Sequence, residues 1–450
     1  MQKSRNGRNA ETRASAVSAG LENPRAKQRA LAISVVPDEP TDETLSELKE
    51  LLKTAGVATA GEMVQRRPRP DPNRYFGRGK LEDLAAALKE TDANLVACDD
   101  ELEPRQERNL EAALGVPVID RTAVILDIFA DHAHSAEGKL QVELAQLEYN
   151  LARMRGLWTH LERLGGGIAT RGPGESQIET DRRLARDRIN ALRRRLRGLE
   201  RNREVMRGPR EGAAIPRVAL AGYTNVGKST LLNALTGAEA GVGERLFHTL
   251  DATTRAYQHR RRRYLVTDTV GFISKLPHEL IEAFTATLEE TVLADLIVHV
   301  VDASELPAGR AAAIAAVDAA LEEIGAGVKP RVLVLNKIDL LNDAERRELL
   351  IGDRDAIAIS AETGEGVTEL QDRIEAEFAD TLLRLELMFP HTAGGALSDL
   401  HRIAGDLERE DGPDGVLVRA DVPAALAHRF AEFELNGAGA ATANDARPTS

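Results

Sequence analysis

The chain of 450 residues contains one cysteine, Cys98, and no apolar run long enough to cross a membrane. A lone cysteine excludes a disulfide framework and is typical of a reducing compartment. A membrane-spanning helix needs about 18 or more consecutive apolar residues, so we expect no membrane insertion. Residues 1–30 lack the apolar centre of a secretory signal. We expect a disordered tail there, with an organelle transit peptide as the alternative, and a cytoplasmic protein for which peripheral membrane association stays open.

Positive charge is also in deficit, since the formal net charge is −13 at pH 7. Such a surface repels nucleic acid as a whole, so any RNA contact must come from a local basic patch. One such patch runs from Arg182 to Arg210, where twelve arginines outnumber three acidic residues. Because no aromatic side chain interrupts it, the patch favours contact with RNA phosphates over base stacking. A solvated charged face is the alternative.

The central motif is a glycine-rich loop, GYTNVGKS, with an apolar strand predicted before it and a helix after it. This G-x-x-x-x-G-K-S pattern lets successive backbone N–H groups surround a phosphate. Lys228 would reach the β- and γ-phosphates, and the Ser229 hydroxyl would bind Mg²⁺. We therefore expect nucleotide contacts from Gly222, Tyr223, Thr224, Asn225, Val226, Gly227, Lys228, Ser229 and Thr230.

A second motif, DTVG, ends a predicted strand downstream of this loop. Asp268 would hold Mg²⁺ through water, and the Gly271 N–H would meet the γ-phosphate, with Thr269 and Val270 beside them. The next residue is Phe272, where many GTPases carry a glutamine that orients the attacking water. Intrinsic hydrolysis should therefore be slow and should depend on a partner or a second cation.

The segment from Phe247 to Thr254 lies between these two motifs and is the predicted switch region. Thr249 is our first choice for the hydroxyl that completes Mg²⁺ coordination, Thr253 is the second choice, and ordinary loop polarity is the alternative. Loss of the γ-phosphate would release this segment. Asn225 is a candidate K⁺ ligand near the phosphates, unless its side chain only stabilises the loop. The candidate catalytic residues are Lys228, Gly271 and Thr249.

Guanine selectivity is predicted by the motif NKID, which follows another apolar strand. The Asp339 carboxylate can accept hydrogen bonds from guanine N1–H and the N2 amine, neither of which adenine offers in that arrangement. Asn336 and Lys337 complete the motif. Ser360 and Ala361, after the last predicted strand, would place a backbone N–H against guanine O6. Three motifs in this order predict a GTP hydrolase rather than an ATPase.

Residues 136–210 predict an antiparallel helical hairpin. Apolar residues recur at alternating spacings of four and three from Leu140 to Leu161, and a second seam begins at Ile189. Residues 164–176 between the seams contain five glycines and a proline. A long stalk with a flexible, arginine-bearing tip suggests insertion into a partner, and a mobile tip without a target is the alternative.

Residues 31–135 alternate predicted strands and helices, which is typical of a small α/β domain with a mostly parallel sheet. We find no catalytic constellation in it. The run Asp99, Asp100 and Glu101 is either a metal cluster or a solvated turn at a strand end. The segment Tyr75–Lys80 is either a recognition loop or a structural turn.

With these residues assembled, the chain resembles the HflX-type GTPases of the translation-factor-related P-loop class over residues 31–435. The segments YFGRGK, GKLQVELAQLEY and GGGIATRGPGESQIETDRR carry the resemblance together with the three nucleotide motifs, and the last is the most specific. The resemblance implies binding to the large ribosomal subunit and its rRNA, with the hairpin loop near the peptidyl-transferase region. It implies splitting or rescue of stalled or idle ribosomes, switched by hydrolysis of GTP to GDP and phosphate. The residues it nominates for ribosome contact are Gly165, Gly166, Gly167, Arg171, Gly172, Arg182 and Arg183.

The alternative function is a ribosome-docked module for large-subunit silencing or assembly, in which hydrolysis only times release. A tRNA-modifying GTPase is disfavoured because the residues from Ala446 to Ser450 contain no cysteine. We expect a monomer that binds GTP or GDP with Mg²⁺. The expected parts are a disordered tail (1–30), an N-terminal α/β domain (31–135), the hairpin (136–210), a doubly wound GTPase domain (213–380), a small α+β domain (385–435) and a second disordered tail (436–450).

Overall fold

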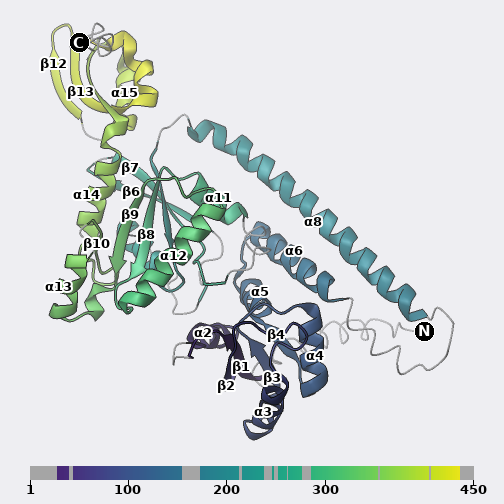
Figure 1. Cartoon of the computed structure of the whole chain (residues 1–450). Helices are drawn as coiled ribbons and strands as arrows, with labels where there is room; N and C mark the ends of the chain where they lie inside the picture. Colours follow the sequence, from purple (N-terminus) through teal and green to yellow (C-terminus); the bar gives the residue numbers. More distant parts are fainter. Residues whose placement is uncertain are drawn as a thin grey trace, which may run out of the picture. The chain divides into compact units, whose positions relative to one another are not determined.

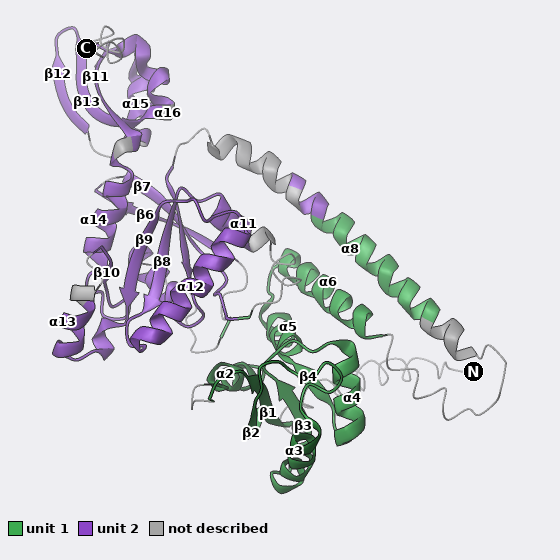
Figure 2. Cartoon of the chain, in the orientation of Figure 1, with its two compact units in different colours: residues 1–196, 244–248, 275–284 green, residues 197–243, 249–274, 285–450 purple. Residues whose placement is uncertain are grey.

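The structure is a computed structural model (Figure 1), and it describes residues 28–39, 44–154, 173–211, 215–237, 246–247, 252–260, 262–275, 285–352, 355–404 and 407–435. The chain divides into two compact units, drawn in green and purple in Figure 2. Unit 1 comprises residues 1–196, 244–248 and 275–284, and unit 2 comprises residues 197–243, 249–274 and 285–450. Two short stretches that flank the predicted switch motifs thus belong to unit 1.

Unit 1 is built on a four-stranded parallel sheet with the strand order β2-β1-β3-β4. Each pair of parallel strands needs a crossover, and a helix supplies it. The predicted small α/β domain is therefore confirmed. Its elements are β1 (Arg29–Val36), α2 (Ser46–Thr54), β2 (Ala58–Arg66), α3 (Arg78–Glu90), β3 (Leu95–Cys98), α4 (Pro104–Leu114), β4 (Val118–Asp120) and α5 (Arg121–His132).

Local sequence explains where the helices of this domain begin and end. α4 starts with a proline in its first turn and with a capping box between Glu103 and Gln106. It ends at Gly115, whose φ of +74° is a left-handed conformation that glycine adopts without strain. α5 follows β4 directly because the Asp120 side chain accepts a hydrogen bond from the Ala123 N–H.

Two further helices, α6 (Ala136–Arg153) and α8 (Pro173–Glu211), form the described part of the predicted hairpin. The buried residues Leu140 and Leu144 on α6, and Ile189 and Leu192 on α8, belong to the predicted seams. α8 already begins at Pro173, so the helix-breaking segment ends earlier than predicted, because proline is well tolerated in a first helical turn. Residues 155–172, which include residues 164–172 of the predicted tip, lie outside the described residues.

Unit 2 contains a six-stranded sheet with the order β10-β9-β8-β5-β7-β6. Its strands are parallel except for β6, which pairs antiparallel with β7. The doubly wound sheet is confirmed, whereas β6 was not predicted; its first two residues, Thr253 and Thr254, had been assigned to the switch segment. The strands are β5 (Arg217–Gly222), β6 (Thr253–His259), β7 (Arg262–Asp268), β8 (Leu296–Asp302), β9 (Arg331–Asn336) and β10 (Ile357–Ala358).

Helices cover this sheet and fill its core. Leu231 and Leu235 of α9, and Leu370 and Ile374 of α14, pack with apolar residues of the strands in one buried cluster. The helical elements are α9 (Lys228–Thr236), α11 (Thr285–Val292), α12 (Pro307–Glu323), η2 (Ile338–Leu340), α13 (Asp343–Gly352), α14 (Val367–Glu377) and η3 (Ala379–Thr381).

The end of the described chain forms a small α+β domain, as predicted. Its antiparallel sheet has the order β11-β13-β12, and its core includes Leu387, Phe389 and Val418. β12 was not predicted, since it is a highly charged edge strand. The elements are β11 (Leu382–Phe389), α15 (Gly394–Ile403), β12 (Leu407–Gly412), β13 (Gly415–Pro423), α16 (Ala424–Ala427) and η4 (His428–Phe433). Within the described ranges, no helix has the length and apolar character required to cross a bilayer.

Candidate nucleotide site

The phosphate-binding loop joins the carboxyl end of β5 to the first turn of α9. Two of its glycines are required by close approach. A Cβ on Gly222 would lie 2.3 Å from the Val300 carbonyl oxygen, and one on Gly227 would lie 2.4 Å from Asn336 Nδ2. Gly227 also has a φ of +91°. These contacts hold the loop against the neighbouring strands β8 and β9 and expose its backbone at the start of α9, where anions bind.

Lys228 places an ammonium group inside this loop. Its Nζ donates hydrogen bonds to the carbonyl oxygens of Gly222 and Tyr223, at 3.1 and 2.7 Å. Burial lowers the pKa of Lys228 from its ordinary value to about 8, and the charge of Asp268 opposes that shift. A buried cation of this kind is better stabilised by an anionic ligand than by carbonyl groups.

Ser229 and Asp268 bring two oxygen donors together beside the loop. The Ser229 hydroxyl donates to Asp268 Oδ2 at 2.6 Å. Asp268 is buried at the end of β7, and the next residue, Thr269, donates from its hydroxyl to the Leu220 carbonyl at 2.7 Å. Hard oxygen ligands are those that Mg²⁺ prefers, so these residues fit the predicted ion.

Of the two hydroxyls predicted to complete the metal site, the structure describes one. Thr249 lies outside the described residues. Thr253 is the first residue of β6, and its partner in the β6–β7 ladder is Asp268. The residue ranked second on sequence therefore lies opposite the aspartate that was predicted to hold Mg²⁺.

The segment after DTVG is bonded to the phosphate loop. Phe272 accepts a hydrogen bond from the Thr224 N–H at 2.8 Å and donates its own N–H to the Gly222 carbonyl at 3.0 Å. The Tyr223 hydroxyl accepts the Ser274 N–H at 2.6 Å. A Cβ on Gly271 would lie 2.8 Å from Thr224 Cγ2, so only glycine fits there. The Phe272 ring is buried and cannot take over the role of a water-orienting glutamine.

Asn336 of the NKID motif ties the guanine loop to the phosphate loop. Its Nδ2 donates to the Val226 carbonyl at 2.8 Å, and its Oδ1 accepts the Ala361 N–H at 2.9 Å. The Ser360 N–H bonds to the Glu365 carbonyl. The backbone N–H groups of Ser360 and Ala361, one of which was predicted to meet guanine O6, thus both bond within the protein in this structure. Asn336 accepts the Ala361 N–H because its side chain turns inward between the two loops. Asp339 is exposed in η2, where its carboxylate is accessible to a base.

Lys337, the second residue of the motif, has a left-handed backbone with φ of +67°. Its Nζ forms an ion pair with Asp302 Oδ2 at 2.6 Å. Asp302 was not predicted from the sequence. The available signal was its place at the end of a strand adjacent to both nucleotide loops.

Other predicted contacts lie elsewhere. Phe247 is buried in unit 1 and packs edge-on against Phe129, with 4.6 Å between the ring centroids. The ring of Phe247 is therefore used for packing, and its contact with the nucleotide stays a prediction. On α8, Arg182 is half-buried and Arg183 is exposed. The remaining nominated ribosome contacts, Gly165, Gly166, Gly167, Arg171 and Gly172, lie outside the described residues.

Two of the three carboxylates at the end of β3 in unit 1, Asp99 and Asp100, are ion-paired within the protein, whereas Glu101 is exposed. Asp99 pairs with Arg121 at 2.8 Å and with Lys275 at 2.9 Å, and Asp100 pairs with Lys275 at 2.6 Å. Burial raises the pKa of Asp99, against the opposing charges of Arg121 and Lys275. Tyr75 is buried and donates its hydroxyl to Asp100 at 2.5 Å, which favours the structural reading of the YFGRGK segment.

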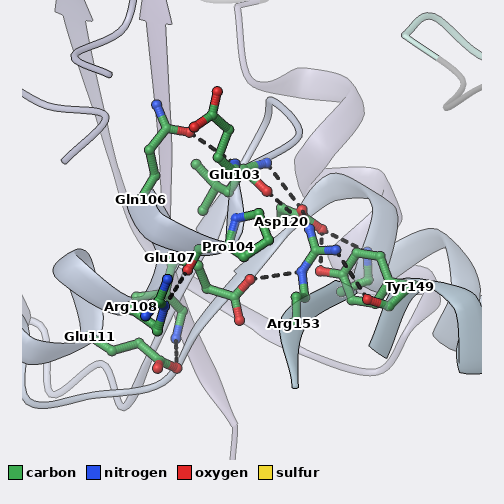
Figure 3. Close-up of polar contacts among 12 residues, drawn as sticks. Glu103, Pro104, Gln106, Glu107, Arg108, Glu111, Asp120, Tyr149 and Arg153 are labelled. Atoms are coloured by element: carbon green, nitrogen blue, oxygen red, sulfur yellow. Dashed lines mark hydrogen bonds and ion pairs between the residues drawn. The ribbon is translucent and has the colours of Figure 1, made fainter. Parts of the chain in front are cut away.

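A second ion network joins β4, α4 and α6 (Figure 3). Asp120 is fully buried and accepts hydrogen bonds from Arg153 at 2.7 Å and from the Tyr149 hydroxyl at 2.8 Å. Arg153 also pairs with Glu107 at 2.8 Å. The carboxyl edge of this sheet is therefore filled with the protein's own charge pairs.

A lysine-bearing phosphate loop, an aspartate ending the neighbouring strand and an NKID loop all meet at the carboxyl edge of one mostly parallel sheet. This arrangement defines a P-loop GTPase. Family models match as the GTP-binding GTPase N-terminal region (residues 42–130), the GTP-binding GTPase middle region (132–210) and the 50S ribosome-binding GTPase (217–337).

Curated relatives give the particular family. The GTPase HflX of Caldanaerobacter subterraneus is 44% identical over 91% of this chain and 94% of its own. The GTPase HflX of Escherichia coli is 44% identical over 84% of this chain and 90% of its own. The chain belongs to the HflX family of GTPases and is a GTP hydrolase. Among solved structures, a complex of SsGBP with GDP covers 78% of this chain and 98% of its own, with 26% identity and a TM-score of 0.44.

Proposed function

We propose that this GTPase binds the large ribosomal subunit and splits stalled or idle ribosomes, with GTP hydrolysis as the switch. The observation that carries the proposal is the combination of a guanine-nucleotide site with a long arginine-rich helix in one chain. The match to a model described as a 50S ribosome-binding GTPase supports the choice of partner.

α8 has the dimensions and charge of an RNA-binding element. It contains 39 residues, so it is about 58 Å long. Two of its arginines, Arg188 and Arg193, are paired with Glu143 and Glu148 of α6, which orients the helix on its neighbour. The remaining exposed arginines can contact phosphates. Each such contact makes the affinity for RNA fall more steeply as the salt concentration rises. They include Arg183, Arg186, Arg194, Arg195 and Arg197.

The nucleotide site supplies the switch. Lys228 neutralises phosphate charge, and Ser229 and Asp268 would hold Mg²⁺, which offsets charge on the β- and γ-phosphates when bound. The Gly271 N–H and the Thr249 hydroxyl would detect the γ-phosphate. Because Phe272 cannot orient water, we propose slow intrinsic hydrolysis, stimulation by the large subunit, and a contribution from K⁺ at Asn225.

Sedimentation of whole ribosomes tests the proposal. The protein with a non-hydrolysable GTP analogue should convert whole ribosomes to subunits, whereas the protein with GDP should not. A variant with Arg194, Arg195 and Arg197 changed to glutamine should lose this activity and keep its nucleotide affinity. Replacement of the exposed Arg384 by glutamine is the matched control. Binding to the large subunit without separation of whole ribosomes would instead support the docked module in which hydrolysis times release.

Guanine selection has its own test. Asp339→Asn should move nucleotide preference from GTP towards xanthosine triphosphate by at least about 100-fold, because the amide replaces one of the two carboxylate acceptors with a hydrogen-bond donor. Asp343→Asn, at an exposed residue four positions later, should leave preference unchanged. An Asp339→Asn variant that still prefers GTP would remove this assignment.

A K⁺ contribution is tested by measuring hydrolysis in potassium and in sodium salts of equal ionic strength. The wild-type rate should be higher in potassium, and Asn225→Ala should abolish the difference. Equal wild-type rates in the two salts would remove K⁺ from the proposal.

A further inference from the structure

Asp302 lies between the two nucleotide loops although it belongs to neither motif. It ends β8, the strand that pairs with β5 on one side and with β9 on the other. Its partner in the β8–β9 ladder is Asn336, and the Ala303 N–H donates to the Asn336 carbonyl at 2.8 Å. The backbone of Asp302 is therefore fixed relative to the guanine loop.

The carboxylate is also fixed by its own hydrogen bonds. Oδ1 of Asp302 accepts the Ser304 N–H at 2.9 Å and the Ser304 hydroxyl at 2.6 Å. Oδ2 contacts Lys337 Nζ at 2.6 Å. One oxygen thus holds the turn after β8 while the other holds the lysine, and the Asp302 side chain is only 13% exposed.

Lys337 needs such a partner. Its left-handed backbone disfavours any residue with a Cβ by about 1 kcal/mol or more, so the conformation is held by surrounding contacts. A lysine side chain also has large rotamer entropy, which must be lost when the loop is ordered around a ligand. The ion pair with Asp302 removes part of that freedom before a nucleotide arrives.

We propose that Asp302 is a positioning residue for the guanine loop and acts through Lys337. The inference rests on the proposed guanine reading by Asp339. A loop ordered in advance binds more tightly because less ordering remains to be done on binding. Since GTP and GDP share the same base, both affinities depend equally on this ion pair.

Affinities for fluorescent analogues of GDP and GTP test the proposal. Asp302→Ala should weaken both by the same factor, about tenfold, as expected for loss of a charge-assisted contact. Asp302→Asn keeps an oxygen acceptor without the charge and should fall between the wild type and Asp302→Ala. Glu305→Ala, at an exposed acidic residue three positions later, is the matched control, and its affinities should stay within about twofold of the wild type.

A double-mutant cycle separates positioning from a general structural role. In a Lys337→Met background, Asp302→Ala should weaken binding by less than about twofold, since its effect passes through the lysine. Equal tenfold losses in both backgrounds would overturn the proposal, as would wild-type affinity in Asp302→Ala. Thermal unfolding of each variant, with and without GDP, confirms that it is folded.

The same measurements distinguish this proposal from the one on which it rests. Failure of the wild-type protein to bind GDP, or failure of Asp339→Asn to change base preference, contradicts the guanine reading itself. Normal wild-type binding and a normal effect of Asp339→Asn, combined with no effect of Asp302→Ala, overturn only the role of Asp302.

Discussion

The two parallel sheets of this protein use their carboxyl edges in opposite ways. In unit 1, the buried carboxylates Asp99 and Asp120 are paired with arginines of the same unit. In unit 2, Lys228 is buried among backbone carbonyls, and Asp339 is exposed. The carboxyl edge of the sheet in unit 1 therefore holds carboxylates that are paired with arginines. The carboxyl edge of the sheet in unit 2 holds a lysine and a carboxylate that are not paired with each other. The charges of Lys228 and Asp339 are therefore available to a ligand.

The local sequence at the strand ends accounts for the contrast. In unit 2, Gly222 and Gly227 let the chain after β5 pass close to β8 and β9, so backbone N–H groups face the space above the strands. In unit 1, Asp120 ends β4 and caps α5 at once, which leaves no loop between the two elements. A strand end without a loop has room for a side-chain network and none for a phosphate.

The largest expected effect is in unit 1. Asp120→Ala leaves Arg153 and the Tyr149 hydroxyl without a buried acceptor. The free energy of unfolding, measured with urea, should fall by about 3–5 kcal/mol, the range for breaking a buried charge pair. Glu82→Ala, at an exposed position on α3, is the control and should change it little. A loss under about 1 kcal/mol would show that the network is not the stabilising feature of this edge.

The corresponding change in unit 2 should affect binding instead. Lys228→Met keeps the apolar stem and removes the ammonium group. GDP affinity should fall by at least about 100-fold, because a buried charge-assisted contact with phosphate is lost. Unfolding in the absence of nucleotide should become no easier, since a buried cation has been removed. If Lys228→Met lowered the stability and kept the GDP affinity, the charge of Lys228 would be structural, as the charges in unit 1 are. Lys89→Met on the surface of α3 is the control.

Lys275→Gln should have an intermediate effect on stability. Asp99 and Asp100 lose a shared cation, and the loss should be about 1 kcal/mol because the Lys275 side chain is half-exposed. Removing the cation raises the already elevated pKa of Asp99 further. The folded variant therefore holds a proton more tightly than the unfolded chain does, and its stability falls as pH rises through that interval. Urea unfolding should differ from the wild type at pH 7 and converge with it at about pH 4; an equal difference at both would contradict this account.

The smallest effect is a pH dependence of nucleotide binding. The pKa of Lys228 is about 8 in the empty site, and phosphate stabilises its charged form. GDP affinity should be constant at lower pH and should fall about threefold between pH 7.5 and 8.5. Calorimetry in buffers of different ionisation enthalpy should show proton uptake above pH 8. Lys228→Met should abolish both signals, and a flat profile in the wild type would contradict them.

The same lysine makes an opposite contribution to folding. Because its folded pKa lies below that of the unfolded chain, the unfolded state binds more protons between about pH 8 and 10.5. The contribution of Lys228 to the unfolding free energy of the empty protein therefore rises over that interval.

Three motifs with a known spacing were enough to predict the GTPase sheet and its nucleotide class. The phosphate loop and DTVG depend on residues close in sequence, and their geometry follows from glycine and strand ends. β6 escaped prediction because TTRAYQH is polar and its first two residues had been assigned to the switch segment. Its strand character comes from pairing with β7, a contact that periodicity alone does not report.

Local sequence was therefore enough to predict the candidate phosphate-binding, metal-binding and base-reading residues, because each motif's chemistry depends on neighbours a few positions away. Tertiary structure alone decided which charges are compensated. Asp99 meets Lys275 across 176 positions, and Lys337 meets Asp302 across the gap between two strands. Charge pairing depends on distance in space, and residues remote in sequence acquire that distance only when the sheets have formed.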